Sequence, residues 1–394
     1  MKNYNLMMIL VLIIFSSIIF LTPSIQAKNK GSTYVELENL PQPRFDHVAF
    51  LYNDYIYVFL GFHEYQDPPI PDNYLAKSII RYNITNNLWE TTDTLPIIGW
   101  GNYSCIMGDN VFIAGGGMQE GWIRDSVFRY NILTEQIDTM ACLPTELING
   151  RGFNDNGSFH ILGGHNGYGP VDVNYVYDTT ADSWSAMTEL PGGLHRNALV
   201  KFDSLVYLLG GRGLGGYPTS DINLIYNTNT DSYSYGSDLL VSVQDAGYAI
   251  LNGEVYIFGG RRSDPPVNDV TGIVQIYNPV TDTWRFGPNL PFPNCDMTAI
   301  TYDGAIYLIG GWNFDSVYDC AYKYISEYKC GDPNGDDDVN IFDISFLIEY
   351  LYLEGPSPIP IESGDVNNDA IANIFDITYL ITYLYLDGPE PDCP

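Results

Sequence analysis

Short runs of β-branched and aromatic residues recur along residues 31–329, and each run ends at glycine. Five runs end in a glycine pair, and Leu60-Gly61 takes that place in the first run. The second glycines of successive copies lie 47 to 55 residues apart. A strand unit repeated at this period predicts the blades of a β-propeller. The five pairs are Gly115-Gly116, Gly163-Gly164, Gly210-Gly211, Gly259-Gly260 and Gly310-Gly311.

A second pattern follows each glycine position. A Tyr is followed seven residues later by an aromatic or apolar residue, with turn residues between them, as in Tyr277 and Trp284. This pattern predicts a hairpin between the third and fourth strands of a blade. At the C-terminal end of the repeat region Tyr324 opens a third strand without a following Trp, whereas Tyr34 to Leu40 at its N-terminal end has no partner before it. We therefore predict that Tyr34 to Leu40 is the fourth strand of the last blade and closes a ring of six blades without a free sheet edge.

The glycine pair, the Tyr and the following Trp together resemble the kelch repeat. The resemblance covers about residues 31–329, with departures in three copies: the first lacks one glycine, the second lacks the Trp and the fourth has Tyr in its place. It implies an all-β domain, a six-bladed kelch β-propeller.

The pattern changes in residues 331–394, where two loops rich in Asp and Asn begin 33 residues apart. Oxygen-bearing side chains occupy positions 1, 3, 5, 9 and 12 of each loop, which suits calcium because this ion prefers six to eight oxygen ligands. The apolar runs Ile344 to Leu353 and Ile377 to Leu386 follow the loops and predict two helices. Position 6, a usual place for glycine, holds Asp337 and Ala370.

A duplicated loop and helix, with no helix before the first loop, resembles the type I dockerin domain. The resemblance implies a small α-helical domain that binds two calcium ions and a cohesin-like module or cell-surface protein. The implied calcium ligands are Asp332, Asn334, Asp336, Asp338, Asn340 and Asp343 in the first loop, and Asp365, Asn367, Asp369, Ile371, Asn373 and Asp376 in the second. Asp338 and Ile371 would contribute backbone carbonyls.

In this family, positions 10 and 11 of each loop help to select the cohesin. Here these positions hold Ile341-Phe342 and Ile374-Phe375, so two equal faces could bind in either of two orientations. The alternative is that these apolar residues pack only the domain's own core. Cys330 and Cys393 bracket the segment and are the predicted disulfide, while the pairing of Cys105, Cys142, Cys295 and Cys320 stays open.

Residues 1–27 have the pattern of a signal peptide. Lys2 precedes the apolar run from Met7 to Leu21, and Ala27 ends a plausible cleavage site. The alternative is an uncleaved membrane anchor, although the run is short for a span. We predict a secreted protein, with attachment to a cell surface as an option and no membrane span after processing.

The net charge of −31 excludes nucleic acids as partners, because such a chain repels them. Turns expected on one face of the propeller nevertheless collect arginines and a tryptophan, which suit carboxylates and sugars. We expect an acidic glycan or protein ligand at this rim; the alternative is that these residues tie blades together. The predicted ligand-binding residues are Arg44, Arg151, Arg196, Arg212, Arg261 and Trp312.

The chain has no nucleophile elbow, HExxH motif or phosphate loop. We therefore interpret it as an exported binding protein without catalytic residues, attached through its dockerin-like domain. Two alternatives stay open: a carbohydrate-active enzyme, such as a hydrolase or sugar mutarotase in polysaccharide breakdown, and a structural component of the cell surface.

Overall fold

The computed structural model describes residues 29–30, 33–64, 74–97, 99–118, 122–214, 219–263, 268–326, 328–336, 338–353, 355–358, 361–369 and 371–393. The predicted signal peptide, residues 1–27, lies outside the described residues. The chain divides into two compact units, and the boundary between them lies after Ile325. The C-terminal unit includes strand β30 (Tyr328–Lys329), which pairs with β1 (Asn29–Lys30).

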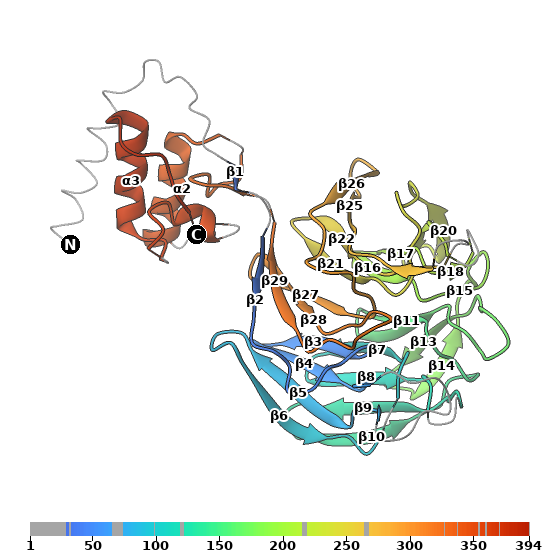
Figure 1. Ribbon diagram of the computed structural model, residues 1–394. Coiled ribbons are helices and arrows are strands. Elements are labelled where there is room, and N and C mark those ends of the chain that lie inside the picture. Colours follow the sequence, from blue (N-terminus) through green and yellow to red (C-terminus); the bar gives the residue numbers. More distant parts are fainter. Residues whose placement is uncertain are drawn as a thin grey trace. The chain divides into compact units, whose positions relative to one another are not determined.

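The larger unit contains six four-stranded antiparallel sheets, arranged as the blades of a propeller (Figure 1). This architecture confirms the predicted fold class. The first three blades are β3 (Val48–Tyr52), β4 (Tyr55–Phe59), β5 (Ser78–Asn83) and β6 (Leu88–Thr94); β7 (Tyr103–Met107), β8 (Asn110–Ala114), β9 (Val127–Asn131) and β10 (Gln136–Met140); and β11 (Arg151–Asp155), β12 (Ser158–Leu162), β13 (Asn174–Asp178) and β14 (Ser183–Ala186). The other three are β16 (Ala198–Phe202), β17 (Leu205–Leu209), β19 (Asn223–Asn227) and β20 (Ser232–Tyr235); β21 (Gly247–Leu251), β22 (Glu254–Phe258), β25 (Val274–Asn278) and β26 (Thr283–Gly287); and β27 (Thr298–Tyr302), β28 (Ala305–Ile309), β29 (Ala321–Ile325) and β2 (Thr33–Glu36). Two short ribbons connect loops, β15 (Leu194–His195) with β18 (Arg212–Gly213) and β23 (Arg261–Arg262) with β24 (Asp269–Val270).

Strand β2 completes the last blade from the other end of the propeller sequence. It pairs with β29, so that Tyr34 lies opposite Tyr324 and their ring centroids are 5.1 Å apart. The Tyr34 hydroxyl also donates to the carbonyl of Pro288 at 2.9 Å. The strand is shorter than the predicted Tyr34 to Leu40, but it closes the ring as expected.

The glycine pairs end the second strand of their blades where no side chain fits. The second glycine of each pair has a φ between 95° and 113°, a left-handed region that favours glycine. A Cβ atom on Gly164 would collide with the hydroxyl of Tyr103 from the neighbouring blade. In the first blade, Leu60 accepts a φ of 59° in place of the missing glycine.

In four of the six blades, the repeated Tyr and the following Trp or Tyr join the blade to the one before it, through a contact that we call the blade latch. In the third blade, the Tyr177 hydroxyl donates to Asp182 at 2.6 Å, and Asp182 accepts the backbone N–H of Ala141 at 2.8 Å. The Trp184 indole N–H then donates to the carbonyl of Ala141 at 2.9 Å. The corresponding residues are Tyr82, Asn87, Trp89 and Glu38; Tyr226, Asp231, Tyr233 and Thr188; and Tyr277, Asp282, Trp284 and Ser237.

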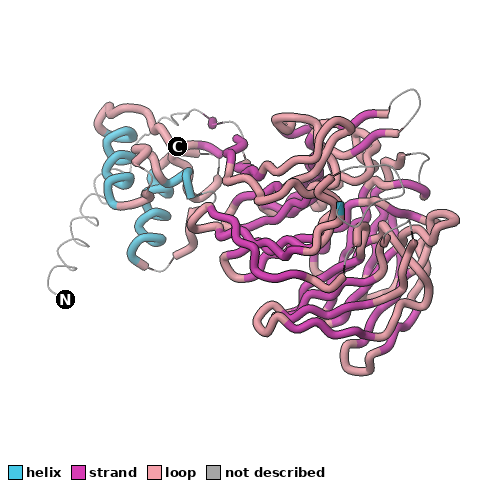
Figure 2. The backbone as a smooth tube through the Cα atoms, turned by 60° about the horizontal axis from the view of Figure 1, so that its bottom comes forward, coloured by secondary structure: helices cyan, strands magenta, loops and turns pink. Residues whose placement is uncertain are grey.

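The C-terminal unit contains α2 (Ile341–Tyr352), a short 3-10 helix η3 (Ile361–Gly364) and α3 (Ile374–Tyr385), which contrast with the strands of the propeller (Figure 2). Helices α2 and α3 contact each other and bury Leu347 and Leu380. A disulfide joins Cys330 to Cys393, with 5.6 Å between their Cα atoms. Among the described residues, no helix has the length and apolar character needed to cross a bilayer.

Candidate functional site

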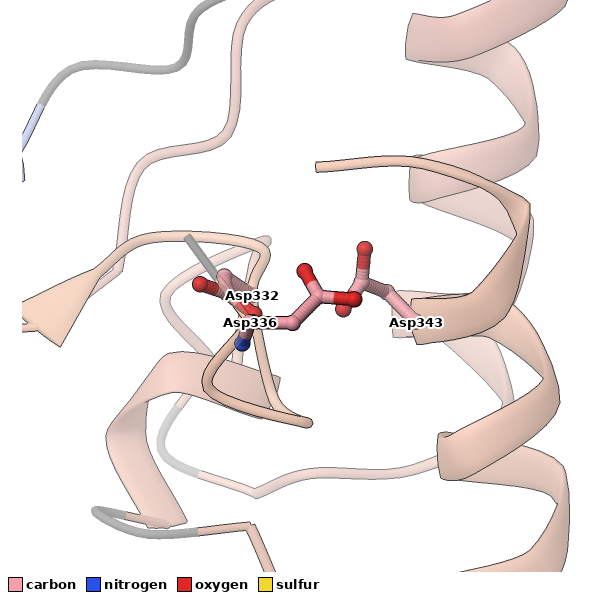
Figure 3. Close-up of side chains that lie close together, drawn as sticks. All are labelled: Asp332, Asp336 and Asp343. Carbon is pink, nitrogen blue, oxygen red and sulfur yellow. The ribbon is translucent and has the colours of Figure 1, made fainter. Parts of the chain in front are cut away.

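Three carboxylates of the first acidic loop converge at the start of α2. Asp332 and Asp336 come from the loop, and Asp343 comes from the first turn of the helix (Figure 3). One oxygen of each residue lies within 4.8 Å of the others. Asp332 and Asp343 are buried, so this negative charge is partly withdrawn from water. Burial, reinforced by Asp332 and Asp336, raises the pKa of Asp343 to about 7. A bound cation would compensate the buried negative charge and the repulsion between the three carboxylates, so these residues fit a calcium ion.

Backbone hydrogen bonds wrap the first loop around these carboxylates. Asp332 Oδ1 accepts the N–H groups of Gly335 at 2.9 Å and Asp336 at 3.1 Å. Asn334 Oδ1 accepts the N–H of Asp336 at 2.9 Å, and Asp336 Oδ1 accepts the N–H of Asp338 at 3.0 Å. These hydrogen bonds between residues of the same loop hold its oxygen-bearing side chains close to the backbone N–H groups.

The second loop repeats this arrangement at the start of α3. One oxygen each of Asp365, Asp369 and Asp376 lies within 4.8 Å of the others. Asp376 Oδ1 accepts the N–H of Val366 at 2.9 Å, and burial raises the pKa of the Asp376 carboxyl. Asn367 Oδ1 accepts the N–H of Asp369 at 3.0 Å. The two loops therefore offer equivalent carboxylate sets.

Position 9 of each loop has a role that the sequence prediction missed. Asn340 and Asn373 are the N-caps of α2 and α3, and their side-chain oxygens accept the N–H groups of Phe342 at 2.8 Å and Phe375 at 2.7 Å. The amide of Asn373 also donates to the carbonyl of Ile371 at 2.8 Å. Each cap oxygen thereby stabilises the first turn of its helix. Position 6 of both loops, Asp337 and Ala370, lies outside the described residues.

Two phenylalanines at the starts of the helices project into solvent. Phe342 and Phe375 are each 67% exposed, whereas Ile341 is half-buried and Ile374 is 39% exposed. The phenylalanines therefore do not serve the domain's own core. Leu353 and Leu386, which cap the other ends of the helices, are also exposed. The prediction omitted this second pair, although its spacing of 33 residues repeats that of the phenylalanines.

Some of the predicted ligand-binding residues of the propeller rim are buried in the structure, and others are partly exposed. Arg44 is fully buried and donates to the carbonyl and hydroxyl oxygens of Ser78, and Trp312 is only 5% exposed. Neither side chain is accessible to a ligand, so for these two the alternative role of joining parts of the propeller applies. The prediction failed here because sequence position places a residue on a turn but does not give the partner that draws it inward.

The remaining arginines of the rim lie nearer to solvent. Arg196 forms an ion pair with Asp245 at 2.8 Å, and Arg151 donates to the carbonyl of Asn197 at 2.6 Å. Arg212 and Arg261 are half-buried, and the Arg261 guanidinium lies 5.1 Å from the centroid of the Phe314 ring. Arg151, Arg212 and Arg261 therefore keep part of their surface on this face.

Two histidines that were not predicted as site residues accompany these arginines. The rings of His165 and His195 have centroids 5.2 Å apart. Burial, followed by the charge of Arg196, lowers the pKa of His195 to about 3, so its imidazole is neutral. The same two causes lower the pKa of His165. Between the third and fourth blades, the rim thus places these two imidazoles beside the guanidinium groups of Arg196 and Arg212.

Comparison with known proteins identifies both parts of the chain. Residues 244–291 match the Kelch motif family, and residues 330–385 match the Dockerin type I domain family. Kelch-like protein 36 of Bos taurus is 25% identical over 173 residues, which are 41% of this chain and 26% of that protein. Kelch-like protein 15 of Homo sapiens is 20% identical over 204 residues, or 46% of this chain and 32% of that protein. The chain spans less than a third of the length of either relative.

The solved structure of YjhT has the same propeller fold. The two structures superpose with a TM-score of 0.64 at 14% sequence identity, and the superposition includes 74% of this chain and 99% of the YjhT chain. Type I dockerin domains bind calcium and cohesin partners and are typical of extracellular proteins, and the acidic groups of the C-terminal unit are compatible with calcium. The chain therefore combines a six-bladed β-propeller that carries the Kelch motif with a C-terminal type I dockerin domain.

Proposed function

We propose that this chain is an exported binding protein, which its dockerin domain attaches to a cohesin-type module in a calcium-dependent manner. The observation that carries the proposal is the duplicated exposure of Phe342 and Phe375, each at the start of a helix that follows a carboxylate cluster. Exposed aromatic residues on a rigid helix are suitable anchors for a protein interface. Residues 1–27 would direct the export, and the partner would stand on a scaffold or cell surface.

Two calcium ions would be held by the two loops, one by each. Asp332, Asp336 and Asp343 would supply carboxylate oxygens to the first ion, and Asp365, Asp369 and Asp376 would supply them to the second. The bound ions would neutralise the carboxylates and tie each loop to the first turn of its helix. Phe342 and Phe375 each lie two residues after the N-cap of their helix. Ordering of the loops would therefore also fix the positions of these two aromatic side chains.

The propeller would recognise a glycan or protein ligand on the rim that carries Arg151, Arg212 and Arg261. Guanidinium groups with part of their surface exposed favour an anionic group, such as a carboxylate, because they bind it through paired hydrogen bonds. This proposal drops Arg44 and Trp312 as contacts, because both are buried.

The attachment is tested with an immobilised type I cohesin module and the mature full-length chain. Binding is measured with calcium and with excess chelator, for the native chain and for Phe342→Ala, Phe375→Ala and the double variant. With two equal faces, each single variant should retain binding, whereas the double variant should bind at least about tenfold more weakly. Tyr235→Ala removes an exposed aromatic side chain of the propeller and serves as the control. The proposal would be contradicted if the double variant bound cohesin with the affinity of the native chain, or if the native chain still bound it in excess chelator.

A further inference from the structure

Two aromatic side chains are exposed to solvent on neighbouring turns of the propeller rim. Trp122 follows the second strand of the second blade and is 68% exposed, and Tyr168 follows the second strand of the third blade and is 98% exposed. The two turns adjoin, because a Cβ atom on Gly167 would lie 3.5 Å from Cδ1 of Ile123. Each aromatic residue is next in sequence to a residue of this contact. We call Trp122 and Tyr168 the aromatic pair.

Hydrogen bonds within its turn hold Tyr168 in this exposed position. The side-chain oxygen of Asn166 accepts the backbone N–H groups of Tyr168 at 3.0 Å and Gly169 at 3.2 Å. The N–H of Gly167 donates to Nδ1 of His165 at 2.9 Å, and the N–H of Asn166 donates to the carbonyl of Gly169 at 3.3 Å. Because these bonds fix the backbone of the turn, a ligand that contacts Tyr168 has to order little more than its side chain.

Backbone hydrogen bonds also fix the position of Trp122. The N–H of Met118 donates to the carbonyl of Trp122 at 2.7 Å, and Gly117 pairs with the next residue, Ile123. Most of the surface of both aromatic side chains is exposed, so the propeller does not need either of them for its own packing. An exposed aromatic ring on a fixed turn is instead suited to contact a ligand.

Guanidinium groups lie next to the turn that carries Tyr168. Burial, and then the charges of Arg196 and Arg212, lower the pKa of His165, so both cations are near this turn. The backbone of Arg212 pairs with that of His195, whose ring centroid is 5.2 Å from that of His165. Arg196 is engaged in an ion pair, whereas Arg212 is half-buried and keeps part of its surface on the rim. Arg212 is therefore the cation best placed to meet a ligand that lies on the aromatic pair.

We infer that this part of the rim binds a polysaccharide that contains hexuronic acid, with its sugar rings on Trp122 and Tyr168 and a carboxylate at Arg212. The C–H face of a pyranose ring packs against the face of an aromatic ring, and a guanidinium group binds a carboxylate through paired hydrogen bonds. Two aromatic side chains on separate turns favour a chain of sugars over a single sugar. The inference rests on the proposed function of the propeller and deepens it, because it names the class of ligand and adds two contacts.

A glycan fits this surface better than a protein partner does. The centre of a protein interface is a packed apolar patch, whereas the residues beside Tyr168 in its turn are Asn166 and two glycines. The net charge of −31 opposes any polyanion at long range. Salt screens this repulsion beyond about 10 Å, so the adjacent guanidinium groups determine the interaction at contact.

Calorimetric titration of the mature chain at pH 7, with calcium and separately with excess chelator, tests the inference. The probes are the tetramers of α-1,4-linked galacturonic acid and of β-1,4-linked glucuronic acid, the methyl ester of each, and tetraglutamate blocked at both ends. Each ester keeps the sugar rings and loses the negative charge of the carboxyl groups. We expect saturable binding of at least one acid tetramer under both conditions, and binding of its ester that is at least about tenfold weaker.

Variants then locate the site. Trp122→Ala and Tyr168→Ala should each weaken binding of the acid tetramer about tenfold, because each removes one stacking surface. Tyr168→Phe keeps the aromatic ring and should restore most of the affinity. Arg212→Gln should bring the affinity for the acid close to that for the ester. Tyr235→Ala removes an exposed aromatic side chain of an edge strand and is the control; thermal melting verifies that every variant is folded.

Four outcomes would overturn the inference. The first two are native affinity in both alanine variants and equal affinity for an acid tetramer and its ester. The third is binding of the acid tetramers only in the presence of calcium, because that result would place the ligand at the acidic loops. The fourth is binding of tetraglutamate alone, which would leave the proposed function of the propeller in place, whereas saturable binding of no probe counts against both.

Discussion

Asp231 occupies a left-handed turn position in the fourth blade, with a φ of 49°. Its carboxylate accepts the Tyr226 hydroxyl of its own blade at 2.8 Å and both the N–H and the hydroxyl of Thr188 in the third blade. In the acidic loops, by contrast, the buried Oδ1 of Asp343 has no hydrogen-bond partner among the described residues. Before the first strand of the last blade, burial and then the charges of Asp245 and Asp46 raise the pKa of Asp296 well above its usual range. The neighbours of each carboxyl group thus decide whether an aspartate joins two blades, fits a metal ion or favours its protonated form.

Removing the latch carboxylate should loosen two blades at once. Asp231→Ala deletes the acceptor for three donors, and we expect the free energy of unfolding of the propeller to fall by about 1–2 kcal/mol. Urea denaturation followed by tryptophan fluorescence measures the change. Asp231→Asn should stay close to the native stability, because Asn87 performs the same role in the first blade. Equal losses in the two variants would argue against the latch.

The latch carboxylates also predict an acid limit to stability. Hydrogen bonds from neighbours lower the pKa of Asp182 and Asp282, and hydrogen bonds that outweigh burial lower the pKa of Asp231. Each of these carboxyl groups has a lower pKa in the folded protein than in the unfolded chain. Its ionised form therefore stabilises the fold at neutral pH, and this stabilisation is lost as the pH falls below about 4. The triple variant with asparagine at these positions should therefore show a flatter melting temperature between pH 5 and pH 3. An unchanged acid slope would contradict this explanation.

At the scale of elements, the fold could be predicted from the sequence because each repeated residue has a local or nearest-blade cause. Gly164 needs its backbone conformation and lacks room for a side chain, while Tyr177 and Trp184 contact the preceding blade. These causes recur at a fixed period, so they leave a visible pattern in the sequence.

The sites were less predictable. Within each acidic loop, the three carboxylates lie on a stretch of twelve residues, so the sequence of one loop is enough to predict that they converge. The burial of Arg44 depends on a residue 34 positions away. Likewise, a ring of hydrogen bonds between successive blades joins residues tens to hundreds of positions apart, namely Asp46, Gly101, Asn149, Arg196, Asp245 and Asp296. The six ring positions also hold four different residue types, so no repeat marks them in the sequence.

Strand β2 is the element on which ring closure depends. Tyr34 packs against Tyr324 and bonds to Pro288, whereas its neighbour Val35 is 43% exposed. Tyr34→Ala should lower the free energy of unfolding by about 2–3 kcal/mol, and Val35→Ala should change it little. Thermal and urea denaturation of the two variants provide the comparison. Similar effects from both substitutions would show that closure does not depend on this contact.

For the whole molecule, the two units use their acidic residues differently. The propeller holds itself together through strands, latches and a closed ring, none of which needs a metal. The C-terminal unit has a small core and one disulfide, and it places two carboxylate clusters at the starts of its helices. Attachment is thus expected to respond to calcium, while the propeller keeps its fold without it.

The most direct test of this account is a calorimetric titration of the metal-free mature chain with calcium. The account predicts two ions bound per native chain, and one ion per chain in each of the variants Asp343→Asn and Asp376→Asn, since each variant removes the carboxylate that its helix contributes. Absence of binding by the native chain, or two ions bound by both variants, would contradict it.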